Sequence, residues 1–256
     1  MKKIMLLTAA ALAFAGCDPK VDPVTPVTPS SNDTYAIVAG VENGYAGKCD
    51  GCLLDAQRMK DIISPYATKL TYLPDQKATR SAVAAALKEA VQHELCIFFY
   101  SGHGGSTPAS SDKTETDGYD EFLCLYDGGM LDNEVWNIIK NSKGRVFLMF
   151  DCCHSATMYR AVKPFDFRDQ LRKLSATSTV NGNISMICWS GCPDNTYSYG
   201  SSSGGELTNT FRKYFDKDLT YDQLWAKIEA DKTLQKYEKV QRTLMGTKFG
   251  SKKIFQ

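Results

Sequence analysis

The chain has 256 residues, with 30 Lys and Arg against 29 Asp and Glu, so its formal net charge is +1. A charge so close to zero argues against a binding surface for nucleic acid or anionic lipid, and we expect no nucleic-acid partner. Nine cysteines, in a chain long enough for one large core, leave both thiol chemistry and disulfides open.

The first sixteen residues are typical of an export signal. Two lysines precede an apolar run at 4–14 that is too short to span a bilayer, and Cys17 follows a pair of small residues. This pattern resembles the lipobox of a bacterial lipoprotein. We therefore expect a signal peptide at 1–16 and a lipidated Cys17 that begins a Pro/Thr/Ser-rich tether at 17–33. The protein would be exported and anchored by its lipid to a bacterial cell membrane, with the membrane and its face left open.

From residue 34 to residue 256 the chain alternates between strand and helix patterns. Strands are predicted at 35–41, 69–73, 95–101, 145–151 and 183–189, with a final extended piece at 242–255. Helices are predicted at 53–63, 79–92, 133–140, 206–215 and 221–236. Strands separated by helices indicate one α/β domain, a three-layer α/β/α sandwich with a mostly parallel central sheet of about six strands.

Two of these strands, at 95–101 and 145–151, are apolar throughout, as strands buried on both faces of a parallel sheet are. The first runs into Gly-His-Gly at His103, and the second into Cys152 and Cys153. If the strands are neighbours, their carboxyl ends lie roughly 5 Å apart and bring an imidazole and a thiol to one sheet edge. The pattern predicts a cysteine nucleophile. Because successive strand residues point to opposite faces, only one of the two cysteines can face His103.

A family resemblance decides between them. His103 precedes Cys153 by about fifty residues, the order and spacing typical of caspases. Ser-Gly-His-Gly and Asp-Cys-Cys-His-Ser together resemble the metacaspase branch of the caspase-like cysteine peptidases (clan CD, peptidase C14). Further stretches resemble that family from residue 34 onward: YAIVAGV at 35–41, GCLLDAQRM at 51–59, DGYDEFLCLYDG at 117–128 and ICWSGCPDNTYS at 187–198. The resemblance implies a caspase-like fold for 34–256.

The resemblance also implies residue roles. It makes Cys153 the nucleophile and His103 its base, with the backbone N–H groups of Gly104 and Cys153 as oxyanion donors. It implies a pocket for an Arg or Lys side chain at P1, the substrate residue before the cleaved bond. The residues of that pocket would be Cys52, Asp55, Ser101 and Asp151. Two buried carboxylates beside a nucleophile are indeed unfavourable unless a cation joins them.

We therefore expect a membrane-tethered cysteine endopeptidase that acts on proteins or peptides after Arg or Lys. Two alternatives stay open: an inactive caspase-like scaffold or binding module, and a clan CD peptidase with a different P1 preference. The proposed chemistry requires no cofactor. Calcium is a candidate ligand, because Asp117, Asp120 and Asp132 could supply oxygen ligands, although a solvated acidic loop explains them equally well.

Other cysteines and one basic segment complete the predictions. Two closely spaced pairs, Cys49 with Cys52 and Cys188 with Cys192, could form disulfides or supply four zinc ligands. The unequal spacings argue against zinc. The long connection after the cysteine strand is rich in Lys and Arg, which predicts self-cleavage after Arg172 or Lys173, or else a solvated surface helix.

Overall fold

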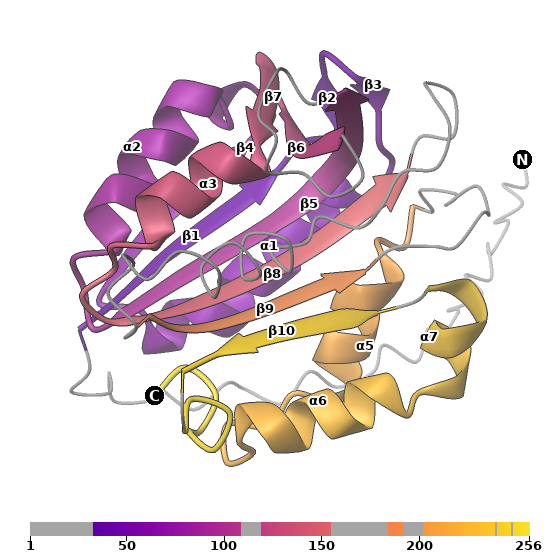
Figure 1. Ribbon diagram of the computed structural model, residues 1–256. Coiled ribbons are helices and arrows are strands. Elements are labelled where there is room, and N and C mark those ends of the chain that lie inside the picture. Colours follow the sequence, from indigo (N-terminus) through magenta and orange to yellow (C-terminus); the bar gives the residue numbers. More distant parts are fainter. Residues whose placement is uncertain (1–32, 109–118, 155–183, 192–201, 239, 247) are drawn as a thin grey trace, which may run out of the picture.

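The fold is organised around one twisted sheet (Figure 1). The computed structural model describes residues 33–108, 119–154, 184–191, 202–238, 240–246 and 248–256. Six strands follow one another in the order β10-β9-β8-β5-β1-β4. Their bounds are β1 (Thr34–Gly40), β4 (Lys69–Pro74), β5 (Leu95–Pro108), β8 (Arg145–His154), β9 (Ser185–Gly191) and β10 (Gln241–Met245). All pair in parallel except β10, which is antiparallel to β9. The predicted mostly parallel sheet is confirmed.

Helices cover both faces of this sheet (Figure 1). One face packs against α2 (Arg80–Ala90) and α3 (Asp132–Ile139) through a core cluster that includes Leu87 and Trp136. The other face packs against α1 (Cys52–Ile63), α5 (Glu206–Tyr214), α6 (Tyr221–Glu229) and α7 (Lys232–Tyr237). The three layers of the predicted sandwich are therefore present. Among the described residues, no helix is long and apolar enough to cross a bilayer.

Capping side chains set two helix boundaries. The predicted cap Thr79 accepts a hydrogen bond from the Ala82 N–H and starts α2. The single helix predicted at 221–236 is wrong, because it is two helices, α6 and α7. The Asp231 side chain accepts hydrogen bonds from Thr233 N and Leu234 N, so it starts a second helix where the periodicity alone suggested continuation.

The strands that carry the predicted catalytic residues are longer than expected. β5 continues past Ser101 to Pro108, and β8 continues past Asp151 to His154. Gly102 lies within β5, and a Cβ there would lie 2.2 Å from the Tyr100 hydroxyl oxygen. That hydroxyl donates to the carbonyls of His103 and Cys124. Gly102 is therefore needed for the tyrosine to fold back across its own strand.

Two short hairpins lie at the carboxyl edge of the sheet. The strands β6 (Tyr119–Leu125) and β7 (Gly128–Leu131) extend the sheet beside the far half of β5. The strands β2 (Asn43–Gly44) and β3 (Gly47–Lys48) form a separate two-stranded sheet between β1 and α1. Both hairpins surround the place where β5 and β8 end, so this edge is the part of the molecule where a site can be built.

Candidate active site

The register of β5 and β8 places the predicted catalytic residues opposite one another. His103 pairs with Cys153, and Ser101 pairs with Asp151. Adjacent strands lie roughly 4.8 Å apart, so the backbones of His103 and Cys153 are direct neighbours. For Cys153 the structure describes the backbone. The predicted juxtaposition of the two strand ends at one sheet edge is confirmed at the level of the backbone.

The imidazole of His103 has one nitrogen in use and one available. Its Nε2 lies 3.0 Å from the backbone carbonyl oxygen of Lys48. A carbonyl only accepts hydrogen bonds, so Nε2 carries the proton in the neutral ring and Nδ1 is the basic nitrogen. Nδ1 is buried and has no hydrogen-bond partner in the described part of the chain. An unpaired basic nitrogen at the sheet edge is suited to accept a proton from a thiol.

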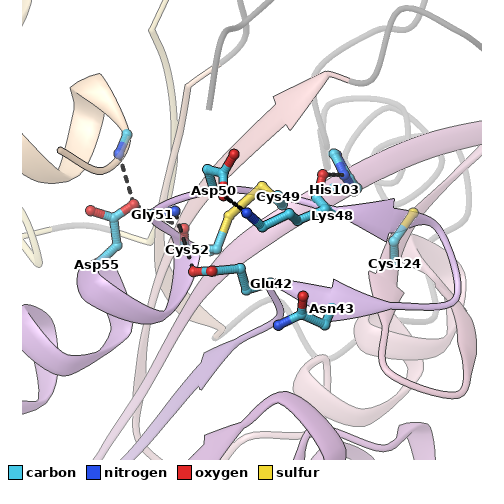
Figure 2. Close-up of a disulfide and its surroundings, with 12 residues drawn as sticks. Glu42, Asn43, Lys48, Cys49, Asp50, Gly51, Cys52, Asp55, His103 and Cys124 are labelled. Carbon is cyan, nitrogen blue, oxygen red and sulfur yellow. Dashed lines mark hydrogen bonds and ion pairs between the residues drawn. A yellow bond between two sulfur atoms is a disulfide. The ribbon is translucent and has the colours of Figure 1, made fainter. Parts of the chain in front are cut away.

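The Lys48 carbonyl belongs to a segment that is fixed at several points. A disulfide joins Cys49 to Cys52, and both residues are buried. The backbone N–H of Cys49 also donates to the carbonyl of Glu42. Figure 2 shows the disulfide between the Lys48–His103 contact and Asp55 on the first turns of α1. The segment thus links the candidate catalytic histidine to the predicted pocket residues Cys52 and Asp55.

The disulfide decides between the two alternatives, a disulfide or zinc ligands, for the first of the two cysteine pairs. Cys49 and Cys52 form the disulfide that was one of the two options. In the ranges that the structure describes, no group of three or more His, Cys, Asp or Glu side chains is arranged to hold a metal ion. Of the second pair, Cys192 lies outside the described residues.

The side chain of Cys152 lies inside the molecule. It is 6% exposed and belongs to the core cluster between the sheet and helices α2 and α3. Ser101 and Asp151, one residue away from the Gly102–Cys152 pair, interact instead with α1 and α5 on the other face. The alternation of strand residues thus directs Cys152 away from the face that carries the proposed pocket.

The proposed pocket residues come together on the α1 and α5 face. The Ser101 hydroxyl donates to Oδ2 of Asp55 at 3.1 Å, and the backbone N–H of Gly205 donates to the same oxygen at 2.7 Å. The backbone N–H of Thr208 donates to Oδ2 of Asp151 at 2.7 Å. Both acids are 1% exposed. The amino end of α5 therefore lies against both acids. At this end of a helix the dipole favours negative charge.

A close approach of backbone to carboxylate defines the floor of this pocket. A Cβ on Gly205 would lie 2.4 Å from each carboxylate oxygen of Asp151. Only a residue without a side chain lets the start of α5 come this near to the acid. Cys52, the remaining predicted pocket residue, is the first residue of α1 and is held by the disulfide.

Burial disfavours the charged form of these acids. Burial, together with the neighbouring Asp151 carboxyl, raises the pKa of Asp55 to about 8. Burial also raises the pKa of Asp151 above its ordinary range. The guanidinium of Arg58 lies 3.8 Å from Oδ1 of Asp55 and offsets this effect only in part. Both acids therefore favour their protonated forms in this structure.

Two of the three predicted calcium residues, Asp120 and Asp132, do not lie in a solvated acidic loop. Asp120 is 4% exposed and Asp132 is 1% exposed, so that interpretation is wrong for both. Oδ1 of Asp120 accepts a hydrogen bond from the Asn133 side-chain amide, and Oδ1 of Asp132 accepts one from the Asn133 backbone N–H. Their burial follows from the β6–β7 hairpin, which the sequence pattern did not reveal. Asp117 lies outside the described residues, as do Cys17, Arg172 and Lys173.

Sequence reasoning missed one acid at this edge. Glu238, between α7 and β10, is 8% exposed. Burial, with the nearby carboxyls of Asp151, Glu206 and Asp55, raises the pKa of Glu238 well above its ordinary range. No motif surrounds this residue, so only the fold brings it to the pocket.

Comparison with known proteins agrees with this architecture. A family model described as a caspase domain (peptidase C14) matches residues 33–248. Metacaspase-5 of Trypanosoma cruzi is 25% identical over 236 residues, which is 75% of this chain and 52% of that protein. Metacaspase-1 of Botryotinia fuckeliana is 26% identical over 221 residues, covering 77% of this chain and 50% of that protein. The chain thus spans about half the length of these relatives.

A solved structure shares the fold. The crystal structure of a protein from Geobacter sulfurreducens superposes with a TM-score of 0.65 at 24% sequence identity. The match covers 87% of this chain and 98% of that one.

Proposed function

Since the chain belongs to the caspase-domain family of cysteine peptidases, we propose that it is a cysteine endopeptidase that cleaves after Arg or Lys with His103 and Cys153. The observation that carries the proposal is the pairing of these two residues across β5 and β8, beside the two buried acids Asp55 and Asp151. The inactive-scaffold alternative has less support, because both residues of the dyad are present and His103 keeps a basic nitrogen without a described partner.

In the proposed reaction, Nδ1 of His103 takes the proton of the Cys153 thiol. The thiolate attacks the carbonyl carbon of the peptide bond, and a tetrahedral oxyanion forms. The backbone N–H groups of Gly104 and Cys153, on neighbouring strands, stabilise that oxyanion. His103 then gives its proton to the departing amine. Water hydrolyses the resulting thioester, and the thiol returns to its starting state. The Lys48 carbonyl holds the ring orientation throughout and stabilises the imidazolium, because it accepts from Nε2.

The two buried acids support the proposed preference for a basic residue at P1. Asp55 and Asp151 are too buried to stay charged without a cation, and a guanidinium or ammonium group supplies one. Binding of a basic side chain therefore releases protons from these acids. Because the pKa of Asp55 is about 8 in the empty pocket, the KM for basic substrates is expected to decrease as the pH rises toward that value.

A panel of fluorogenic peptides that differ only at P1 tests the specificity. The full-length protein should cleave after Arg and Lys and leave Asp, Asn and Leu uncleaved. Asp151→Asn should lower kcat/KM for the basic peptides. The expected loss in transition-state binding free energy is about 2–5 kcal/mol, the cost of removing one partner of a desolvated charge pair. A preference for Asp, Asn or an apolar residue at P1 would show that the pocket assignment is wrong.

The N-terminal segment supports a second element of the proposal, a lipid anchor at Cys17 that holds the enzyme at a bacterial membrane. The support is the basic start, the short apolar run and the cysteine after two small residues. Cys17→Ala should abolish labelling with radioactive palmitate and release the protein from the membrane fraction. Membrane association that persists in the unlabelled variant would assign the anchor to another segment.

Self-cleavage at Arg172 or Lys173 is the third element. Its support is a long basic connection that begins beside a site proposed to act on basic residues. Intact-mass measurements should show two fragments for the wild type and one full-length chain for Cys153→Ala. A single full-length mass for an active wild type would exclude a requirement for processing.

A further inference from the structure

The first turn of α5 gathers three carboxyl groups from separate parts of the chain. The backbone N–H of Gly205 donates to Asp55 on α1, and that of Thr208 donates to Asp151 on β8. The carboxyl of Glu238 lies close enough to those of Asp151, Glu206 and Asp55 to interact with them electrostatically. Two N–H groups at one helix end thus donate to acids and a third acid lies close by, although a helix end gains at most a modest amount from one negative charge.

Glu238 lies on the same face as Asp151. A Cβ on Gly191 would be 2.5 Å from Oε2 of Glu238, and Gly191 is the register partner of Asp151 across β8 and β9. Paired residues of parallel strands direct their Cβ positions to the same face of a sheet. The Glu238 carboxyl therefore lies beside the Asp151 carboxyl.

Two oxygens of this group have no hydrogen-bond partner in the described part of the chain. They are Oδ1 of Asp55 and Oε2 of Glu238, both buried. A buried carboxylate oxygen without a donor is costly unless a ligand supplies one. The guanidinium of Arg58, 3.8 Å from Oδ1 of Asp55, is too far away for a hydrogen bond, and the guanidinium or ammonium group of a basic substrate would supply the missing donors.

We propose that Glu238 is a specificity-determining residue, the third acid of the P1 pocket, and that it makes the enzyme prefer arginine to lysine. The inference rests on the proposed function and refines its substrate class. An ammonium group donates from one nitrogen, whereas a guanidinium donates from three nitrogens in a planar fork. Three carboxyl groups around one pocket can each accept a hydrogen bond from a different nitrogen of a guanidinium. For a lysine ammonium group bound by Asp55 and Asp151, the third carboxyl adds little binding free energy.

Paired peptides that differ only in Arg or Lys at P1 test this, with Glu238→Gln as the variant. The control is Glu229→Gln, which removes an exposed acid at the end of α6. The wild type and the control should prefer Arg. Glu238→Gln should lower kcat/KM for the Arg peptide by about tenfold more than for the Lys peptide, the scale of one charged hydrogen bond. Equal effects on both peptides, or no effect, would overturn the role of Glu238 while leaving the peptidase proposal intact.

Small amines give a readout that does not depend on turnover. Agmatine carries the guanidinium of arginine, and cadaverine carries the ammonium of lysine. Agmatine should raise the melting temperature of the wild type more than cadaverine does, and Glu238→Gln should remove that difference. If Glu238→Gln does not fold, Glu238→Asp replaces it, because it keeps a carboxyl but shortens its reach. An unchanged agmatine preference in the variant would reject the inference, whereas a wild type that cleaves neither peptide would reject the proposed function itself.

Discussion

Nε2 of His103 lies 3.0 Å from the backbone carbonyl oxygen of Lys48, a residue 55 positions earlier in the chain. This contact assigns the tautomer of the ring and leaves Nδ1 for the thiol. It also makes the geometry of the active site depend on the segment between β1 and α1.

The Cys49–Cys52 disulfide should support both stability and catalysis. Closing even a short loop restricts the unfolded chain, so Cys49→Ser should lower the free energy of unfolding by about 2 kcal/mol. The variant should also show a lower kcat, because Lys48 directly precedes Cys49 and its carbonyl orients His103. Chemical denaturation and peptide hydrolysis measure the two effects. Alkylation of the unreduced protein followed by mass analysis should find these two cysteines joined, and two free thiols there would refute the expectation.

The Tyr100 hydroxyl should stabilise the backbone of the histidine strand. It donates to the carbonyls of His103 at 2.8 Å and of Cys124 at 2.7 Å. Tyr100→Phe leaves these acceptors without that donor, at a cost of about 1–3 kcal/mol of folding free energy, and kcat should decrease because His103 is less well held. Tyr35→Phe is the matched control: its hydroxyl bonds Thr71 at the other end of the sheet. A kcat in Tyr100→Phe equal to that of the wild type would show that the Tyr100 hydroxyl does not contribute to catalysis.

Ionisation of the Asp55 carboxyl at alkaline pH should lower the free energy of unfolding of the enzyme without substrate. Its pKa is raised from 3.8 to about 8 on folding, so between these values the folded state binds more protons than the unfolded state. The stability that this proton gives is present below pH 4 and is lost as the pH rises through 8. Asp55→Asn should therefore melt higher than the wild type by roughly 2–4 °C at pH 8.5, the shift that about 1 kcal/mol produces in a chain of this size.

The comparison at two pH values checks this assignment. The gain in melting temperature for Asp55→Asn should shrink at pH 5, where the wild-type carboxyl is already protonated. Asp61→Asn, which removes an exposed acid of the same helix, should show no gain that depends on pH. A gain for Asp55→Asn that is equal at both pH values would contradict burial as the source of the raised pKa.

Local patterns predicted the sheet and the catalytic strands because apolar runs and helix periodicity report burial directly. The residues 95–101 and 145–151 do lie in parallel neighbours, and Thr79 does cap its helix. Both strands continue past the ends of these apolar runs, which do not report how far the pairing extends. In β5 the continuation passes through Gly102, which makes space for the hydroxyl of Tyr100.

Features that depend on distant parts of the chain were not predictable in the same way. Glu238 reaches the pocket only because β10 pairs with β9 and brings the preceding residues to the start of α5. The boundary between α6 and α7 depends on the Asp231 side chain, which accepts hydrogen bonds from two N–H groups. The helical hydrophobic periodicity of the sequence continues through this boundary. The burial of Asp120 and Asp132 depends on a hairpin whose strands are not apolar runs.

The central claim is that Cys153 is the nucleophile of a peptidase directed at basic residues. An arginine-based peptide chloromethyl ketone alkylates a catalytic cysteine only when its P1 side chain is bound, so peptide mapping of the labelled full-length protein tests both parts at once. We expect one adduct per chain, located on Cys153, and no adduct in His103→Ala or from the matching aspartate-based reagent. An adduct on Cys152, or equal labelling by the two reagents, would contradict the assignment.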